Sequence, residues 1–313
     1  MSPPGEAAAG RWPGAVRIRE VGPRDGFQNE PETIPTAEKV ALIDALARTG
    51  LRRLEVTSFV RAEVIPQLAD ADAVLAGIDR PPGVALSVLV PNRRGLDRAL
   101  ERRDRFQEIG VFLSASETHN RRNVSRSVAE SLAEVAAVLG RAAEDGLRGE
   151  AVVSVAFGCP YEGRVDPEWV FGLGRALRDA GAAELSFADT TGMANPRQVR
   201  AFFLAAREAL GDEVELTAHF HNTRGAGLAN VVAALGAGVE SFEASFGELG
   251  GCPVPPGATG NIATEDLVSM LEEMGIDTGI DLAALLDCAR RAERTLGRTL
   301  GSHTLRAGPV NWG

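Results

Sequence analysis

Residues 184–222 read ELSFADTTGMANPRQVRAFFLAAREALGDEVELTAHFHN. The stretch begins and ends with short apolar runs of strand length, over 184–188 and 215–220. Between them, a segment of helix length starts at Asn195-Pro196, where a capping side chain precedes a proline, and stops at Gly211. Because strands that alternate with helices pair in parallel, this stretch predicts a strand–helix–strand unit.

The same alternation runs through the whole chain. Each strand-sized run is followed by a segment of helix length, so we predict the α/β class and a (β/α)8 TIM barrel with an extra C-terminal helix. A doubly wound sheet is the alternative, but that fold rarely needs eight regular units. The expected strands cover residues 16–21, 53–59, 85–90, 109–114, 151–157, 184–188, 215–220 and 241–246.

The two ends of the chain lack this alternation. Residues 1–15 are mostly small residues, proline and glycine, without the basic and apolar regions of a signal peptide, and we expect a disordered arm. Residues 16–300 form the predicted barrel domain, and residues 301–313 are expected to be an irregular tail.

The composition excludes several classes of protein. Of the 313 residues, 44% are hydrophobic and 24% are charged, and the apolar runs are too short to span a membrane. The net charge of −10 argues against nucleic acid as a ligand on electrostatic grounds. Three cysteines cannot build a disulfide framework, which indicates a reducing compartment, and we expect a cytoplasmic protein.

A barrel carries its active site at the carboxyl ends of its strands, and ionisable residues gather at those places in this sequence. His219 and His221 are two apart on the seventh strand, so both rings point to one face, at a spacing suited to metal ligands. Two partly buried histidines with ordinary hydrogen bonds are the alternative. With oxygen ligands from Asp25 and Asn261, the set would suit Mg²⁺ or Mn²⁺.

Other polar residues at strand ends have two interpretations each. Arg24-Asp25 follows the first strand and is either part of the site or a surface ion pair. Glu55, inside the second strand, is either part of the site or half of an internal salt bridge. Residues 117–123, with Arg121 and Arg122, form either a solvated loop or a contact for anionic substrate groups.

Cysteine and lysine usage narrow the chemistry further. Cys252 lies in a Gly/Pro-rich loop, a setting for a thiol that acts on substrate, whereas Cys288 lies on an apolar helix face. Lys39 is the only lysine and falls within the first helix, which excludes a Schiff base at a strand end.

Several long motifs, in order along residues 16–300, resemble the 3-hydroxy-3-methylglutaryl-CoA lyase family, which belongs to a larger group of metal-dependent barrels that includes isopropylmalate synthase. The motifs are RDGFQNE (24–30), EVTSFV (55–60), GCPYEG (158–163), DTTG (189–192), HFHN (219–222) and GGCPVPPGATGNIATEDLV (250–268).

The resemblance implies a carbon–carbon lyase that cleaves an acyl-CoA substrate, 3-hydroxy-3-methylglutaryl-CoA, to acetyl-CoA and acetoacetate by metal-assisted retro-Claisen chemistry, as in leucine degradation and ketone-body formation. The family's metal ligands fall on Asp25, His219, His221 and Asn261. Its catalytic residues fall on Arg24, which would stabilise the enolate, on Cys252 as an acid/base, and on Asp25, His219 and Glu55. Residues that support substrate binding fall on Gln28, Asp189, Thr190 and Glu265.

Three other functions stay open from the sequence. The first is a lyase for a 3-hydroxyglutaryl-CoA with a longer branch. The second is a condensing enzyme of the isopropylmalate synthase type, and the third is an acyl-CoA-binding barrel without turnover. We expect neither nucleic acid nor membrane as a partner, and a homo-oligomer is compatible with the sequence.

Overall fold

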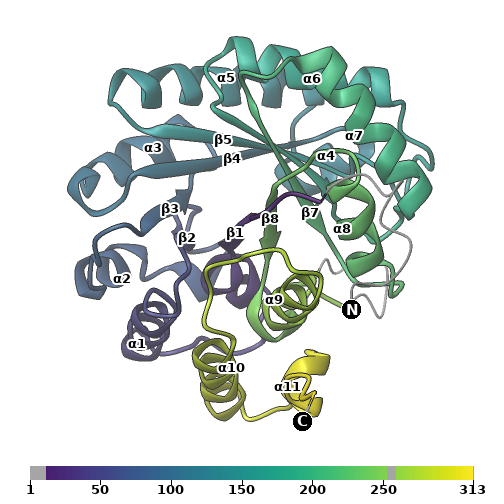
Figure 1. Cartoon of the computed structure of the whole chain (residues 1–313). Coiled ribbons are helices and arrows are strands. Elements are labelled where there is room, and N and C mark those ends of the chain that lie inside the picture. Colours follow the sequence, from purple (N-terminus) through teal and green to yellow (C-terminus); the bar gives the residue numbers. More distant parts are fainter. Residues whose placement is uncertain (1–11, 252–258, 313) are drawn as a thin grey trace, which may run out of the picture.

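The computed structural model describes residues 12–251 and 259–312. Within these ranges, eight strands form a closed, fully parallel barrel in chain order, in which β1 pairs with both β2 and β8. Helices surround the strands on all sides (Figure 1). The predicted TIM barrel is therefore confirmed, and the doubly wound sheet is wrong. The strands are β1 Arg17–Glu20, β2 Arg53–Ser58, β3 Ala85–Leu89, β4 Glu108–Ser114, β5 Arg148–Ser154, β6 Glu184–Asp189, β7 Glu215–Phe220 and β8 Ser241–Ala244.

The extra C-terminal helix is α10, which packs beside α1 and α9 on the outside of the barrel (Figure 1). No helix in the described ranges is long and apolar enough to cross a membrane. The helices are α1 Thr36–Leu46, α2 Ala71–Gly77, α3 Arg93–Leu100, α4 Glu117–Val124, α5 Val128–Glu144, α6 Pro167–Asp179, α7 Pro196–Leu210, α8 Gly227–Leu235, α9 Thr264–Glu273, α10 Leu282–Leu296 and α11 His303–Ala307. Shorter helical turns are η1 Gly22–Gly26, η2 Pro66–Leu68, η3 Arg103–Arg105 and η4 Phe246–Glu248.

The helix starts follow from local sequence. Asp166 and Asn195 each accept a backbone N–H in the first turn of α6 and α7, just before a proline. Ser127 and Glu130 form the reciprocal capping box of α5. These side chains satisfy amide groups that have no partner inside the helix. The starts predicted from these signals are confirmed.

Two segments differ from expectation. Residues 117–123, expected to be a loop, lie in α4, because Ser116 accepts the N–H of His119 as its cap. The expected irregular tail contains α11 over His303–Ala307, where Asp266 of α9 accepts the N–H of both His303 and Thr304. Residues 308–312 are irregular. Most of the predicted N-terminal arm, residues 1–11, lies outside the described residues.

Each strand has one face toward an apolar core outside the barrel and one face toward the charged inside of the barrel. Apolar residues such as Leu54 and Val56 on β2 are buried among the hydrophobic residues of the core. The alternate positions, Arg53 and Glu55, carry charge and point into the barrel, because successive strand residues face opposite sides.

Arg19 is the centre of this internal charge cluster, and its side chain is 1% exposed. Its Nη2 lies 2.9 Å from a carboxylate oxygen of Glu108 and 3.0 Å from one of Glu184, and its Nη1 contacts Glu150. Burial raises the pKa of Glu184, but Arg19 and Arg53 beside it outweigh burial and lower that pKa. Each charge offsets part of the desolvation cost of its neighbours, so removal of one member leaves the others uncompensated.

Arg19→Met should therefore lower the free energy of unfolding by about 3–5 kcal/mol, since it leaves buried carboxylates without their cation. Arg48→Met is the matched control, because the Arg48–Asp79 pair is exposed and its removal should cost under about 1 kcal/mol. Urea unfolding of both variants measures the difference. Equal losses in the two variants would contradict the role given to Arg19.

Candidate active site

The turn after β1 presents Arg24 and Asp25 at the mouth of the barrel. The N–H groups of both residues donate to the carbonyl of Val21, at 3.1 and 2.7 Å, which winds η1 into a tight turn. Gly22 is required there, because a Cβ atom at this position would lie 2.4 Å from the Phe246 ring. The turn is thus locked against the segment that follows β8.

Arg24 is held from two sides. Its Nε donates to Glu55 at 2.6 Å and its Nη1 donates to Asp25 at 2.7 Å. The Arg24 side chain is only 13% exposed, so the surface-pair interpretation is wrong. Glu55 forms an internal salt bridge with Arg24, which is one of the two roles that the sequence left open for it. This salt bridge belongs to the candidate site, so both interpretations of Glu55 apply. Burial raises the pKa of Glu55, and the Arg24 guanidinium opposes that shift.

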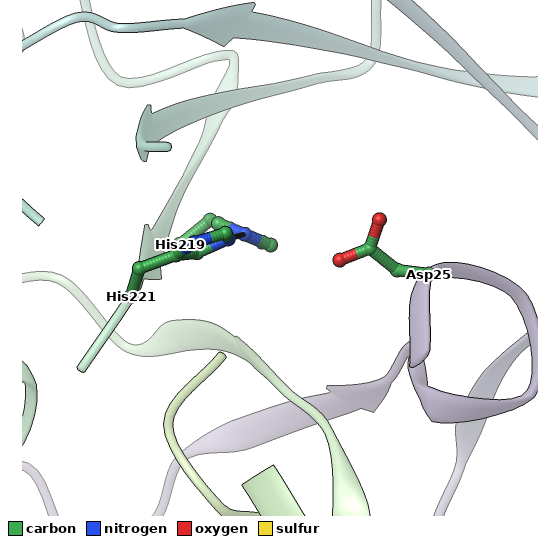
Figure 2. A group of neighbouring side chains, drawn as sticks. All are labelled: Asp25, His219 and His221. Atoms are coloured by element: carbon green, nitrogen blue, oxygen red, sulfur yellow. Dashed lines mark hydrogen bonds between the residues drawn. The ribbon is translucent and has the colours of Figure 1, made fainter. Parts of the chain in front are cut away.

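His219 lies on β7 and His221 follows its end, and the two rings face each other. Their Nε2 atoms are 3.1 Å apart, and Figure 2 shows the Asp25 carboxylate turned toward both rings. One ligand atom from each of Asp25, His219 and His221 lies within 4.8 Å of the others. The three side chains therefore converge on one point, although Asp25 is far from the histidines in sequence.

Asn261 closes this group. Its Nδ2 donates to Asp25 at 2.7 Å and to the Leu249 carbonyl at 3.0 Å, while its Oδ1 is buried without a hydrogen-bond partner. The Nδ1 of His221 is also buried without a partner. Buried polar atoms normally have partners, so unpaired atoms in this group are consistent with a site that binds a ligand.

The ionisation of the group fits a divalent cation. Burial raises the pKa of Asp25, but Arg24, His219 and the Asn261 amide outweigh it and lower the pKa to about 2. Burial and the charge of His219 lower the pKa of His221 to about 3. An ionised carboxylate, imidazole nitrogens and an amide oxygen are ligands that Mn²⁺ and Mg²⁺ accept.

The four residues predicted to support substrate binding lie around the proposed metal site in different local settings. Asp189 accepts the N–H groups of Met193 and Ala194, and Thr190 accepts the N–H of Val155, so both shape loops. The Glu265 carboxylate is fully buried and accepts the Gly247 N–H at 3.0 Å. The Oε1 of Gln28 is buried without a partner.

Cys252 lies outside the described residues. The chain on either side is described, and Gly251 and Gly260 pair as an antiparallel bridge that joins its flanks. Another bridge in this region pairs His221 with Asn261, which places Asn261 beside His221.

Sequence reasoning missed two buried glutamates. Glu243 on β8 lies 3.0 Å from the Nδ1 of His219. Glu20 accepts the N–H groups of Gly22 and Phe246 and the hydroxyl of Thr264, so it joins three loops, and burial raises its pKa to about 7 despite these bonds. The sequence signal that could have identified both glutamates is a charged residue inside or at the end of a short, otherwise apolar strand.

Comparisons with known proteins show which proteins this chain is similar to. Residues 15–291 match the HMGL-like family. The chain is 48% identical over 295 residues to a hydroxymethylglutaryl-CoA lyase of Bacillus subtilis, covering 94% of this chain and 98% of that protein. The crystal structure of a B. subtilis HMG-CoA lyase superposes with a TM-score of 0.91, at 48% identity, over 94% of this chain and 98% of that one.

Two other relatives carry different substrate names. A 3-hydroxy-3-isohexenylglutaryl-CoA/hydroxymethylglutaryl-CoA lyase of Pseudomonas aeruginosa is 41% identical over 94% of this chain and 97% of that protein. An (R)-citramalyl-CoA lyase of Chloroflexus aurantiacus is 42% identical over 95% of this chain and 96% of that protein. The match to the family spans the barrel with all of its strands, and the chain belongs to the HMGL-like family.

Proposed function

We propose that this protein is a carbon–carbon lyase that cleaves 3-hydroxy-3-methylglutaryl-CoA to acetyl-CoA and acetoacetate. The observation that carries the proposal is the convergence of Asp25, His219 and His221 at the mouth of the barrel, beside Arg24. Relatives named for this activity support the choice of substrate. Formation of acetoacetate from the purified protein, substrate and Mg²⁺ tests it, and a condensing enzyme or a barrel without turnover would form none.

Four residues would hold a divalent cation: Asp25, His219, His221 and Asn261. The unpaired Oδ1 of Asn261 and the low pKa of Asp25, about 2, support this set. When bound, such a cation would lower the pKa of the substrate's tertiary hydroxyl. The choice between Mg²⁺ and Mn²⁺ is left to experiment.

Arg24 supplies the counter-charge for the departing thioester. As the bond between C2 and C3 breaks, the hydroxyl carbon becomes the ketone of acetoacetate and negative charge collects on the thioester oxygen. The Arg24 guanidinium is held in advance by Glu55 and Asp25, so it pays no reorganisation cost when that charge develops. Glu55 acts by fixing the orientation of Arg24.

Two proton transfers complete the reaction. We assign acceptance of the hydroxyl proton to the Asp25 carboxylate, while His219 would hold the cation through its Nε2. Cys252 is proposed as the acid that protonates C2 of the acetyl-CoA enolate, on the basis of the family motif. General acid–base groups of this kind contribute about 10²–10⁴-fold to rate.

Further features stay predictions. Gln28, Asp189, Thr190 and Glu265 are proposed to support the bound substrate through the loops that they hold. A cytoplasmic location and a homo-oligomeric assembly also stay predictions. Assay of a substrate with a longer branch, beside the methyl substrate, measures how much of the branch the site accepts.

Removal of the metal should abolish activity. Chelation should stop acetoacetate formation and added Mg²⁺ or Mn²⁺ should restore it, while His219→Ala should stay inactive with either metal. His303→Ala is the matched control, because the His303 side chain is 74% exposed on α11. Full activity of metal-free His219→Ala would contradict the proposed metal site.

Alkylation and mutation should distinguish the role of Cys252 from that of Cys288. Cys252→Ala should lose at least about 10²-fold in turnover, the lower range for acid–base groups. Cys288→Ala should stay near wild type, because burial raises the pKa of the Cys288 thiol to about 12 and keeps it unreactive. Rates of alkylation by iodoacetamide, with and without bound product, provide the measurement. Equal loss of activity in the two variants would show that Cys252 has no special role.

Arg24→Gln should lower kcat by about 10²–10³ with little change in KM, because the charge that it meets exists only in the transition state. Arg24→Lys should recover only part of this loss, since an ammonium cannot reproduce the planar fork. Arg48→Gln, at an exposed pair, should leave kcat unchanged. Steady-state kinetics with a melting curve for each variant give the answer, and an unchanged kcat in Arg24→Gln would remove Arg24 from the mechanism.

A further inference from the structure

One buried carboxylate touches the proposed metal site without belonging to its ligands. Glu243 lies on β8 and its side chain is 4% exposed. Its Oε2 lies 3.0 Å from the Nδ1 of His219. The barrel register sets this contact, because the Cα atoms of His219 and Glu243 are direct partners on the parallel strands β7 and β8.

The two histidines of the site differ in this respect. The Nδ1 of His219 faces a carboxylate, whereas the Nδ1 of His221 is buried without a partner. A carboxylate accepts hydrogen bonds, so Glu243 favours the imidazole form of His219 with its proton on Nδ1. The lone pair then lies on Nε2, the atom that is 3.1 Å from the Nε2 of His221 and faces the cation site.

Glu243 is itself held in place. The Ser186 hydroxyl on β6 donates to the same Oε2 at 2.9 Å, and the Nη1 of Arg19 lies 3.9 Å from Oε1. Arg19 is fixed in turn by its contacts with Glu108 and Glu184. The carboxylate therefore has one orientation, in which one oxygen faces His219 and the other faces the internal charge cluster.

We propose that Glu243 is a positioning residue that keeps the His219 proton on Nδ1 and aims the Nε2 lone pair at the cation. This inference rests on the proposed metal site. Carboxylates that orient a metal-bound histidine in this way strengthen metal binding, and their loss typically costs about 10–100-fold in affinity.

A purely structural role makes a different prediction. If Glu243 served only as a counter-charge for Arg19, loss of Glu108 should affect the site at least as much as loss of Glu243. The reason is that Glu108 lies 2.9 Å from Arg19, whereas Glu243 lies 3.9 Å away. No hydrogen bond or ion pair in the described residues joins Glu108 to His219. Glu108→Gln is therefore a matched control that removes a buried charge beside Arg19 and leaves the His219 contact in place.

The experiment compares Mn²⁺ affinity among the full-length wild type, Glu243→Gln and Glu108→Gln, by electron paramagnetic resonance titration of metal-free protein. We expect Glu243→Gln to bind Mn²⁺ about 10–100-fold more weakly and Glu108→Gln to match the wild type. Nitrogen-15 NMR of the metal-free protein gives a second readout, with the His219 signal identified from its loss in His219→Asn. The His219 proton should lie on Nδ1 in wild type and in Glu108→Gln. In Glu243→Gln it should be shared between the nitrogens, since a glutamine amide can also donate to Nδ1.

Each result has a clear meaning. Wild-type affinity in a folded Glu243→Gln variant, or equal weakening in both variants, would overturn the role of Glu243 and leave the metal site standing. Absence of Mn²⁺ binding by the wild type would instead overturn the metal site and this inference with it. If urea melts show that Glu243→Gln is unfolded, Glu243→Asp takes its place, because it keeps the charge beside Arg19 and withdraws the carboxylate from His219. Unchanged affinity in that variant would also overturn the proposal.

Discussion

Closure of the parallel barrel is the constraint on which the rest of this molecule depends. Because β1 pairs with both β2 and β8, the chain's first and last strands lie side by side, and their carboxyl ends open onto one face. The Asp25 carboxylate and the Asn261 amide are 236 residues apart in sequence, yet they share a 2.7 Å hydrogen bond. Without closure, the turn after β1 and the segment after β8 would lie at opposite edges of a sheet, and no metal site could form between them.

The closed interior of the barrel contains buried charges, and each of them needs a charge of opposite sign nearby. Arg19 and Arg53 lie among inward-facing glutamates, and each pair offsets the cost of burying the other's charge. The same cluster reaches the mouth of the barrel through Glu243, which joins Arg19 to His219. The charge pairing inside the barrel and the orientation of a proposed metal ligand are thus parts of one network.

At the mouth of the barrel, the surroundings shift the pKa values of two carboxylates in opposite directions. The pKa of Asp25 is lowered to about 2 against the effect of burial, chiefly by Arg24, whereas burial raises the pKa of Glu20 to about 7. Asp25 is therefore ionised and suited to hold a cation. Glu20 accepts hydrogen bonds from Gly22, Phe246 and Thr264 and joins the loops around them. Environment assigns one carboxylate to the site and the other to its support.

The sequence by itself determined the eight strands, the barrel and the metal-ligand candidates that meet at its mouth, but it did not indicate α4 or α11. Local signals decide these features, namely the period-two alternation of strands, the caps at Asn195 and Ser127, and the spacing of His219 and His221. Only the tertiary structure decided that Glu55 holds Arg24, that Glu243 faces His219 and that Glu265 lies behind the Gly247 loop. The physical reason is that these contacts join elements that are far apart in sequence, so they depend on strand register and barrel closure, which no local pattern encodes.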